Sequence, residues 1–182
     1  QTPPYSNDDL VRLRAWANSQ STEQQTRRAR AVLAFGAGAG LQPHDLLSMT
    51  AGAVVRDDNV VIAHVPGNDA RTVPVLAAWE DMALQAADGL HPDDKVFPRV
   101  GTARPSELVR EFVRYSAGEQ RPTLARLRAT WIHTHLAAGT SLRALMSAAG
   151  FRSTTSLQRY LVWVPEAPLS ELRLASPVEV SR

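Results

Sequence analysis

The sequence contains no cysteine and only one lysine, Lys95. The absence of cysteine excludes disulfide bonds and thiolate zinc sites. It also means that cysteine usage does not indicate whether the protein acts in an oxidising or a reducing compartment. The 20 lysine and arginine residues are therefore almost all arginine. Arginine pairs with phosphate in a planar, two-pronged geometry that lysine cannot match. A GC-rich coding sequence also favours arginine over lysine, and we attribute most of this bias to it.

Long apolar runs and a strong net charge are also missing. No stretch approaches the length of a membrane span and no signal peptide opens the chain, so we expect a soluble, cytoplasmic protein without a membrane partner. The formal net charge is only +2, which is weak for a protein that must neutralise nucleic-acid phosphates. With 182 residues, of which 44% are apolar, the chain is long enough for one domain with its own core.

The apolar pattern predicts helices, then a small sheet, then helices again. Ser6–Asn18 has a capping serine, early acids and helical spacing, and after a polar break at Ser19–Glu23 a buried helix is predicted over Arg27–Leu41. Pro43 suits the first turn of a further helix. Turn-forming residues separate three predicted strands, Ala53–Arg56, Asn59–Val65 and Arg71–Val75.

The rest of the chain is predicted to be helical. Helices are expected over 75–87, over 106–118 and in three segments between Thr123 and Tyr160. The breaks in the last part fall at Gly139–Thr140 and Gly150–Ser153. We therefore predict a mainly α-helical single domain, 1–182, with a small antiparallel sheet of three strands. Its core would span 6–163, and 164–182 would form a tail.

Four stretches of the sequence match the motifs of one protein family, and they occur in the same order along the chain. Residues 38–47 (GAGLQPHDLL) place Gln42 after a glycine and a leucine, with Asp45 three positions later. Residues 60–75 (VVIAHVPGNDARTVPV) form a hairpin ending in Arg-x-Val-Pro. Residues 123–151 place Arg128 before two spaced glycines, and 153–161 (STTSLQRYL) place Tyr160 ten residues after the second glycine. Together they resemble the catalytic domain of the tyrosine recombinases, the phage integrase family, over about residues 7–163.

The resemblance implies a reaction in which a tyrosine attacks a DNA phosphate, forms a 3′-phosphotyrosine link and frees a 5′-hydroxyl. Tyr160 stands at the position of the nucleophile, and Arg128 stands at the second catalytic arginine. At the other four family positions the catalytic residue is missing. Gln42 stands at the first arginine, and Ala125 and Phe151 stand at the two histidines. The hairpin turn, which includes Asn68, contains no lysine.

The family reaction needs fixed donors where charge develops on the phosphate oxygens, together with a base and an acid for the two proton transfers. Losing one preorganised donor typically lowers the rate about 10²–10³-fold. Our main hypothesis is therefore a DNA-associated recombinase domain without catalytic activity, which binds DNA or assembles with active recombinase subunits. We expect no cofactor and no metal, because His133 and His135 diverge on a helix.

The expected DNA contacts are arginines. We predict a basic surface made of Arg27, Arg28 and Arg30 before the first motif and of Arg126, Arg128 and Arg152 around the pocket. Members of the family carry a separate DNA-clamping domain upstream, which is absent from this sequence, either because the chain is a fragment or because the protein never had that domain. Without that clamp, we expect DNA binding to be weak and tolerant of sequence.

Three other interpretations stay open. An active integrase would need arginines from elsewhere in the chain to converge beside Tyr160. A protein-interaction module would not bind DNA and would form recombinase homo- or hetero-oligomers through Leu169–Ala175 in the tail. In a purely structural interpretation, Tyr160 is a half-buried packing residue and Arg128 is an ion-pair partner in the region of Asp45.

Overall fold

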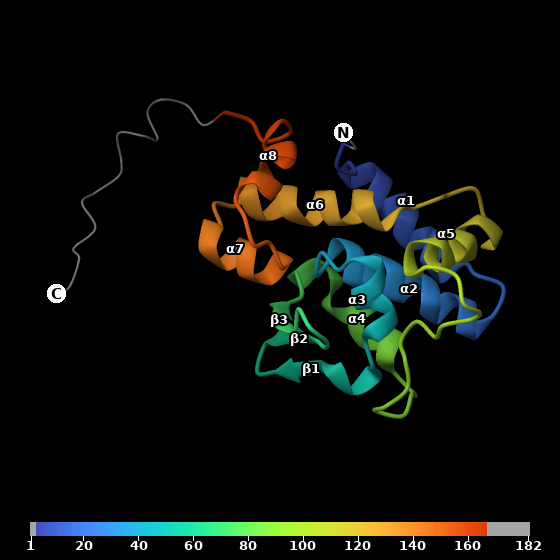
Figure 1. Cartoon of the computed structure of the whole chain (residues 1–182). Helices are drawn as coiled ribbons and strands as arrows, with labels where there is room; N and C mark the ends of the chain where they lie inside the picture. The colour runs from blue at the N-terminus through green and yellow to red at the C-terminus, as the bar shows by residue number, and fades with distance from the viewer. Residues whose placement is uncertain (1–2, 167–182) are drawn as a thin grey trace.

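Residues 3–166, the part of the chain that the computed structural model describes, form eight α-helices and one small sheet, which lies at one edge of the helical part (Figure 1). The helices are α1 (Asn7–Asn18), α2 (Glu23–Ala37), α3 (Pro43–Ser48), α4 (Glu80–Ala87), α5 (Pro105–Tyr115), α6 (Leu124–Ala137), α7 (Leu142–Ala149) and α8 (Thr155–Leu161). The strands are β1 (Val54–Asp57), β2 (Val60–Val65) and β3 (Arg71–Pro74), and single 3₁₀ turns lie at Ala51–Ala53 and Ala77–Trp79. The predicted mainly helical fold with one antiparallel sheet is confirmed.

Helix α2 is the centre of the fold. It packs against α1, α4 and α6, and in Figure 1 it runs beneath α6. Every residue from Ala31 to Ala37 is buried, as expected for a helix that neighbours cover on all sides. The predicted start at Arg27 was four residues late. The helix begins at Glu23, because the Thr22 side chain caps it by accepting a hydrogen bond from the Gln25 amide at 3.1 Å.

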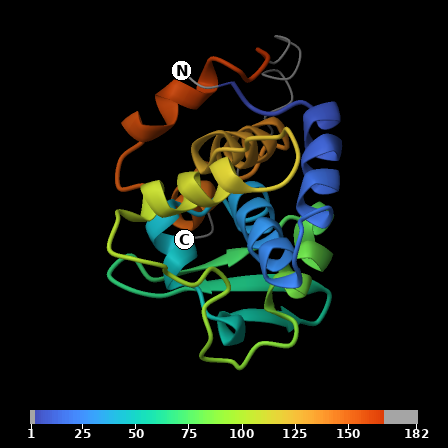
Figure 2. The ribbon, with the colours of Figure 1, turned by 90° about the vertical axis from the view of Figure 1, so that its right-hand side faces the viewer.

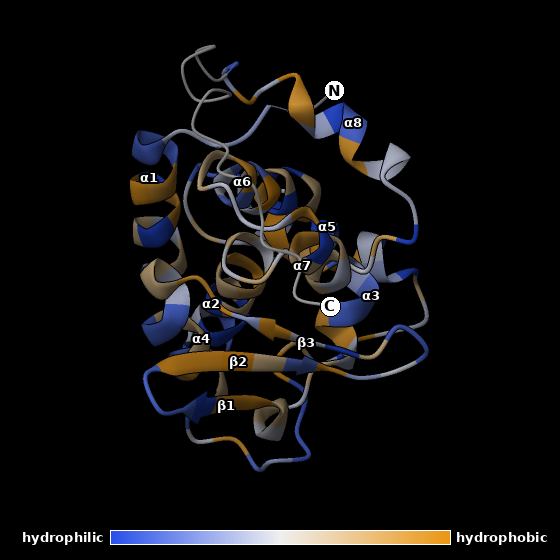
Figure 3. Ribbon diagram, turned by 90° about the vertical axis from the view of Figure 1, so that its left-hand side faces the viewer, coloured by the Kyte–Doolittle hydropathy of each residue, from blue (hydrophilic) through white to orange (hydrophobic). Residues whose placement is uncertain are grey.

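The sheet is an antiparallel meander in the order β1-β2-β3. Val54 lies opposite Ala63, and Ala63 in turn lies opposite Val73. Alternate residues of β2 are buried, and α4 contacts both β1 and β2, so one face of the sheet is covered by helix. Figure 2 shows the sheet along the lower side of the domain, and Figure 3 shows the apolar middle of β2. The three predicted strands are confirmed to within one residue at each end.

The predicted breaks between the last three helices are also confirmed. α6 ends at Ala137 and α7 ends at Ala149, and the glycines that follow, Gly139 and Gly150, both have positive φ. No helix in residues 3–166 combines the length and the apolar character that a bilayer crossing requires. The predicted oligomer segment, Leu169–Ala175, lies outside the described residues.

A close contact fixes the chain where it leaves α2. Gly40 has a φ of +63°, and a Cβ atom at this position would lie 2.2 Å from the ring of Trp131. Because that ring is buried in the core, it has no room to move away. Only glycine therefore fits here.

We expect Gly40→Ala to destabilise the fold strongly. Left-handed backbone costs a residue with a Cβ atom about 1–2 kcal/mol, and overpacking against Trp131 adds about 1–3 kcal/mol. Gly139→Ala is the matched control, because its φ is +70° but no atom lies within 4 Å of the added Cβ. Urea unfolding should show the larger loss for Gly40→Ala. Equal losses in the two variants would show that contact with Trp131 is unimportant.

Candidate functional site

A pocket of about 350 Å³ lies where the chain beyond α2, the start of α6 and the helix α8 meet. Its lining consists of Leu41, Gln42, Pro43, Leu124, Ala125, Arg128, Ala129, Arg159 and Tyr160. Four of the six positions that the resemblance singled out are among these residues. None of the lining residues is acidic, and the only cations among them are two arginines. The pocket is therefore positively charged.

Arg128 is a buried cation in this pocket, with 4% of its surface exposed. Its Nη1 donates to the carbonyl of Gly40, and its Nη2 donates to the carbonyl of Ala149 at 2.6 Å. It forms no salt bridge within residues 3–166. Burial lowers the pKa of Arg128 below the usual value, and the nearby Tyr160 opposes that shift. An arginine stays protonated in proteins, and the two hydrogen-bond acceptors of this buried charge are neutral carbonyl groups.

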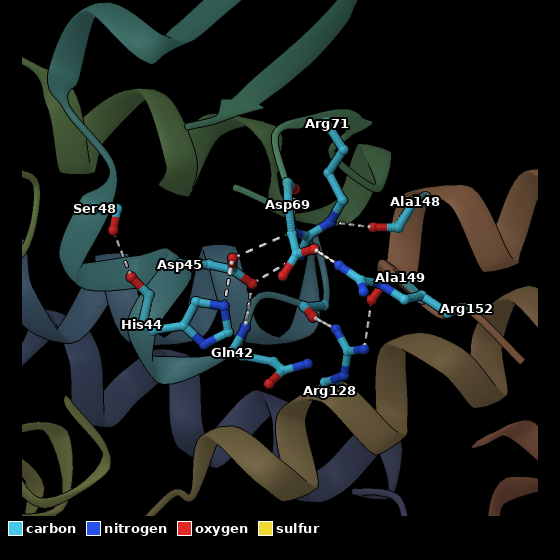
Figure 4. A network of polar contacts seen from close by, with 11 residues as sticks. Gln42, His44, Asp45, Ser48, Asp69, Arg71, Arg128, Ala148, Ala149 and Arg152 are labelled. Atoms are coloured by element: carbon cyan, nitrogen blue, oxygen red, sulfur yellow. Dashed lines mark hydrogen bonds and ion pairs between the residues drawn. The ribbon is translucent and has the colours of Figure 1, made fainter. Parts of the chain in front are cut away.

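Asp45 is paired with Arg71, so the structural interpretation that paired Arg128 with the Asp45 region was wrong. Arg71 Nη2 lies 2.7 Å from Asp45 Oδ2, and Nη1 lies 3.2 Å from Oδ1 (Figure 4). The Gln42 amide also donates to Oδ2, at 3.0 Å. Arg71 engages both oxygens in a two-pronged geometry, which leaves Arg128 without a carboxylate. Asp45 and Arg71 both lie in the motif stretches, but they are 26 residues apart in the sequence, so the sequence did not indicate that they form a pair.

The carboxyl end of α7 is held by the same two arginines. Its glycine turn, with Gly150 at φ +68°, supplies backbone amides to two of the last four carbonyls. The other two accept from side chains: Arg71 Nε donates to Ala148 at 2.8 Å, and Arg128 donates to Ala149. Cations stabilise a helix C-terminus, where carbonyl groups lack partners within the helix. Arg128 therefore has a structural role whether or not it binds a ligand.

Tyr160 lies at the edge of the pocket with 8% of its surface exposed. Arg159 Nη2 donates to the Tyr160 hydroxyl at 2.8 Å, and its guanidinium carbon lies 4.8 Å from the centre of the tyrosine ring. Sequence reasoning missed Arg159, because consecutive residues of a helix point in different directions. Only the long, flexible side chain allows it to fold back over its neighbour.

Phe151 occupies the position of a family histidine and contributes an apolar ring. The Arg128 guanidinium carbon lies 4.9 Å from the ring centre of Phe151, which in turn lies 6.2 Å from the ring centre of Tyr160. A phenyl ring packs well here and attracts the cation. It cannot donate a hydrogen bond to a phosphate oxygen. Phe151 therefore fills the space beside Arg128 and Tyr160 but does not supply the hydrogen-bond donor of the family histidine.

The hairpin turn that contains Asn68 lies beside the link between α7 and α8. Asn68 is exposed, and its neighbour Asp69 pairs with Arg152 at 3.0 Å. The side chain of Arg152 is 88% exposed, so this pair is solvated and contributes little stability. This arginine, which we expected to bind DNA, contacts a carboxylate in the structure, and its contact with DNA stays a prediction.

Most of the arginines that we expected to bind DNA contact other parts of the chain. The three arginines of α2 contact other segments: Arg27 donates to Asp88 O, Arg28 to Pro98 O and Arg30 to Asn18 Oδ1. Arg126 donates to Pro3 O at 2.9 Å, and its guanidinium carbon lies 3.9 Å from the ring centre of Tyr5. These four side chains therefore anchor loops and the amino-terminal segment. Of the six predicted contacts, only Arg128 lines the pocket.

The two histidines of α6 diverge, as their spacing predicted. His133 Nε2 lies 2.9 Å from the carbonyl oxygen of Trp163, and His135 Nδ1 lies 2.9 Å from Thr140 Oγ1. No group of three metal-binding side chains gathers in residues 3–166.

The pairing of Asp45 with Arg71 makes stability depend on pH. Burial by itself raises the pKa of Asp45, but hydrogen bonds from Arg71 and Gln42 outweigh burial and lower it. The stabilisation is therefore complete above the unfolded pKa of about 3.9, and it is lost as the pH falls through the lower folded pKa. We expect Asp45→Asn to destabilise the fold by about 3–5 kcal/mol at neutral pH, since Arg71 stays buried without a counter-ion.

Urea unfolding of both proteins between pH 7 and pH 2 measures this dependence. The difference between wild type and Asp45→Asn should shrink below about pH 4. Arg152→Ala, which breaks an exposed pair, is the control and should change stability by less than about 1 kcal/mol. A difference that stays constant over the whole pH range would exclude the ion pair as its source.

Comparison with known proteins supports the fold. No protein-family model and no curated protein matches this sequence. Among solved structures, XerA recombinase is 20% identical, with a TM-score of 0.61 over 95% of this chain and 62% of that chain. XerH site-specific recombinase bound to its difH substrate is 15% identical, with a TM-score of 0.64 over 96% and 53%.

The Tn1549 transposon integrase in complex with circular intermediate DNA is 16% identical, with a TM-score of 0.59 over 93% of this chain and 63% of that one. This chain thus spans less than two thirds of each of these three proteins. Likeness at such low identity is evidence of shared architecture rather than shared activity. The described part of this chain has the fold of the tyrosine recombinase catalytic domain.

Proposed function

We propose that this domain binds DNA through its phosphate backbone and does not cut it. The observation that carries the proposal is the buried guanidinium of Arg128, which lines a pocket and has no carboxylate partner in residues 3–166. Removing a cation from water is unfavourable unless an opposite charge compensates it. A phosphate oxygen entering the pocket would supply that charge in the geometry that guanidinium favours.

The same pocket lacks the groups that cleavage requires. Gln42 offers a neutral amide at the position of the first arginine and Ala125 offers a methyl group, while Phe151, which contacts Arg128 but does not line the pocket, offers a phenyl ring. No imidazole, carboxylate or lysine among the lining residues can take the phenol proton or protonate the leaving oxygen. The site is therefore suited to holding a phosphate and poorly suited to moving protons.

Two of the three structural neighbours described above are complexes with DNA. XerH was solved on its difH substrate, and the Tn1549 integrase on a circular DNA intermediate. Their shared architecture makes DNA the first ligand class to test here. Assembly with active recombinase subunits remains part of the proposal.

One observation favours a second candidate, an active recombinase with an altered site. Such an enzyme needs a guanidinium from elsewhere beside the tyrosine, and Arg159 donates to the Tyr160 hydroxyl. Two arginines then face the pocket, as the family reaction requires. The missing proton donors and acceptors weigh against this candidate.

Covalent trapping separates the two candidates. We expect no denaturation-resistant adduct when the protein is incubated with nicked suicide substrates, because four of six family positions have lost their chemistry. The assay is gel electrophoresis under denaturing conditions, with Tyr160→Phe as the control. An adduct formed by the wild type and absent from Tyr160→Phe would establish an active enzyme.

A charge placed in the pocket tests DNA binding. Ala125 is exposed at the pocket lining, three residues before Arg128, so Ala125→Glu should pair with that guanidinium and compete with phosphate. Ala125→Gln has the same shape without the charge. Fluorescence anisotropy with a labelled duplex over a range of salt concentrations should give weaker binding for Ala125→Glu alone. The slope of log affinity against log salt should fall by about 0.9 for one lost phosphate contact.

Equal affinities and slopes for the glutamate and glutamine variants would place DNA away from this pocket. Wild-type protein that fails to bind even at low salt would contradict DNA binding and favour the protein-interaction module.

A further inference from the structure

Arg159 is a second cation in the pocket, and the family motif does not account for it. The residue is exposed, yet its guanidinium reaches back over the Tyr160 ring and donates to the hydroxyl at 2.8 Å. Like Arg128, it forms no salt bridge within residues 3–166. The phenol oxygen is a neutral acceptor, and Arg159 has no carboxylate partner within residues 3–166.

The two guanidinium groups differ in freedom. Arg128 is buried and tied to the carbonyls of Gly40 and Ala149, so it is fixed in place. Arg159 has one hydrogen bond in the described structure and lies at the surface. Rotations about the side-chain bonds of exposed residues are fast. The pocket therefore combines one fixed and one movable cation.

The position of Tyr160 sets where a bound phosphate would meet Arg159. A phosphate oriented toward the tyrosine oxygen would lie about 3–3.5 Å from it. The Arg159 nitrogen lies 2.8 Å from the same oxygen, so a small rotation is enough for it to reach a non-bridging phosphate oxygen. Gln42, where the family has its first arginine, can add only a neutral amide hydrogen bond.

We propose that Arg159 supplies the second guanidinium of this pocket, in place of the arginine missing at Gln42, and that it turns from the Tyr160 hydroxyl onto a phosphodiester when DNA binds. This inference rests on the proposed function, because it takes a DNA phosphate as the ligand. It assigns phosphate recognition to a residue next to the tyrosine. In this arrangement Tyr160 serves as the resting partner of Arg159.

The competing interpretation is structural. A cation in the last turn of α8 is favourable by itself, and stacking on Tyr160 would stabilise the helix end. In that case Arg159 would affect folding but not ligand binding. The experiment must therefore measure the ligand contact directly.

Two measurements on the full chain test the inference. The first is fluorescence anisotropy with a labelled duplex, for wild type, Arg159→Gln and the control Arg12→Gln. Arg12 is exposed on α1 and is not part of the pocket lining, and its replacement changes the net charge equally. We expect Arg159→Gln to weaken binding about tenfold, the effect of a lost charge-assisted hydrogen bond. The salt slope should fall by about 0.9, while Arg12→Gln leaves both unchanged.

The second measurement uses inorganic phosphate as the probe. Arginine side chains labelled with nitrogen-15 give Nε signals, and the signal of Arg159 is identified by its absence from Arg159→Gln. Titration with phosphate should shift that signal, and replacing phosphate with chloride at equal ionic strength should not. Thermal unfolding of each variant reports any loss of folding.

The outcomes separate this inference from the proposed function. DNA binding that is unchanged in Arg159→Gln, or a phosphate titration that leaves the Arg159 signal in place, overturns the inference and leaves DNA binding intact. A shifted Arg159 signal in a protein that does not bind DNA supports the anion site and contradicts the proposed function. If neither probe binds, both proposals are wrong.

Discussion

Two guanidinium groups, that of the partly buried Arg71 and that of the buried Arg128, hold the carboxyl end of α7 against the rest of the domain. They donate to the two terminal carbonyls that the glycine turn leaves without backbone partners. Through Asp45 and Gly40 they also connect this end to α3 and to the chain beyond α2. The position of α8, and with it the tyrosine, therefore depends on these hydrogen bonds, since α8 follows directly after that turn.

This arrangement explains why the site keeps its shape after losing its chemistry. Arg128 satisfies buried carbonyls, so replacing it would leave polar groups unpaired as well as remove a phosphate ligand. Tyr160 packs at the pocket edge. Arg128 and Tyr160, which match the family pattern, thus also have a structural function. Gln42 and Ala125, which depart from that pattern, both line the pocket.

Local charge also differs from total charge. The net charge of +2 indicates a weak electrostatic attraction to DNA, and several predicted cations are engaged with loops. The pocket nevertheless carries two arginines and no acid among its described lining residues. Desolvation strengthens such a local field, because water screens buried charges less. The distribution of charge is therefore a better guide to phosphate binding than its sum.

The sequence alone determined the order of elements, the three strands and the breaks at Gly139 and Gly150, because periodicity, turn residues and glycine conformation are local properties. Motif spacing also brought Gln42, Ala125, Arg128 and Tyr160 into one set, and the structure places all four at one pocket. Only the tertiary structure decided which cations are available there. It paired Asp45 with Arg71 and brought Arg159 back over Tyr160. The partner of a long charged side chain depends on what folding places within its reach, which sequence spacing does not specify.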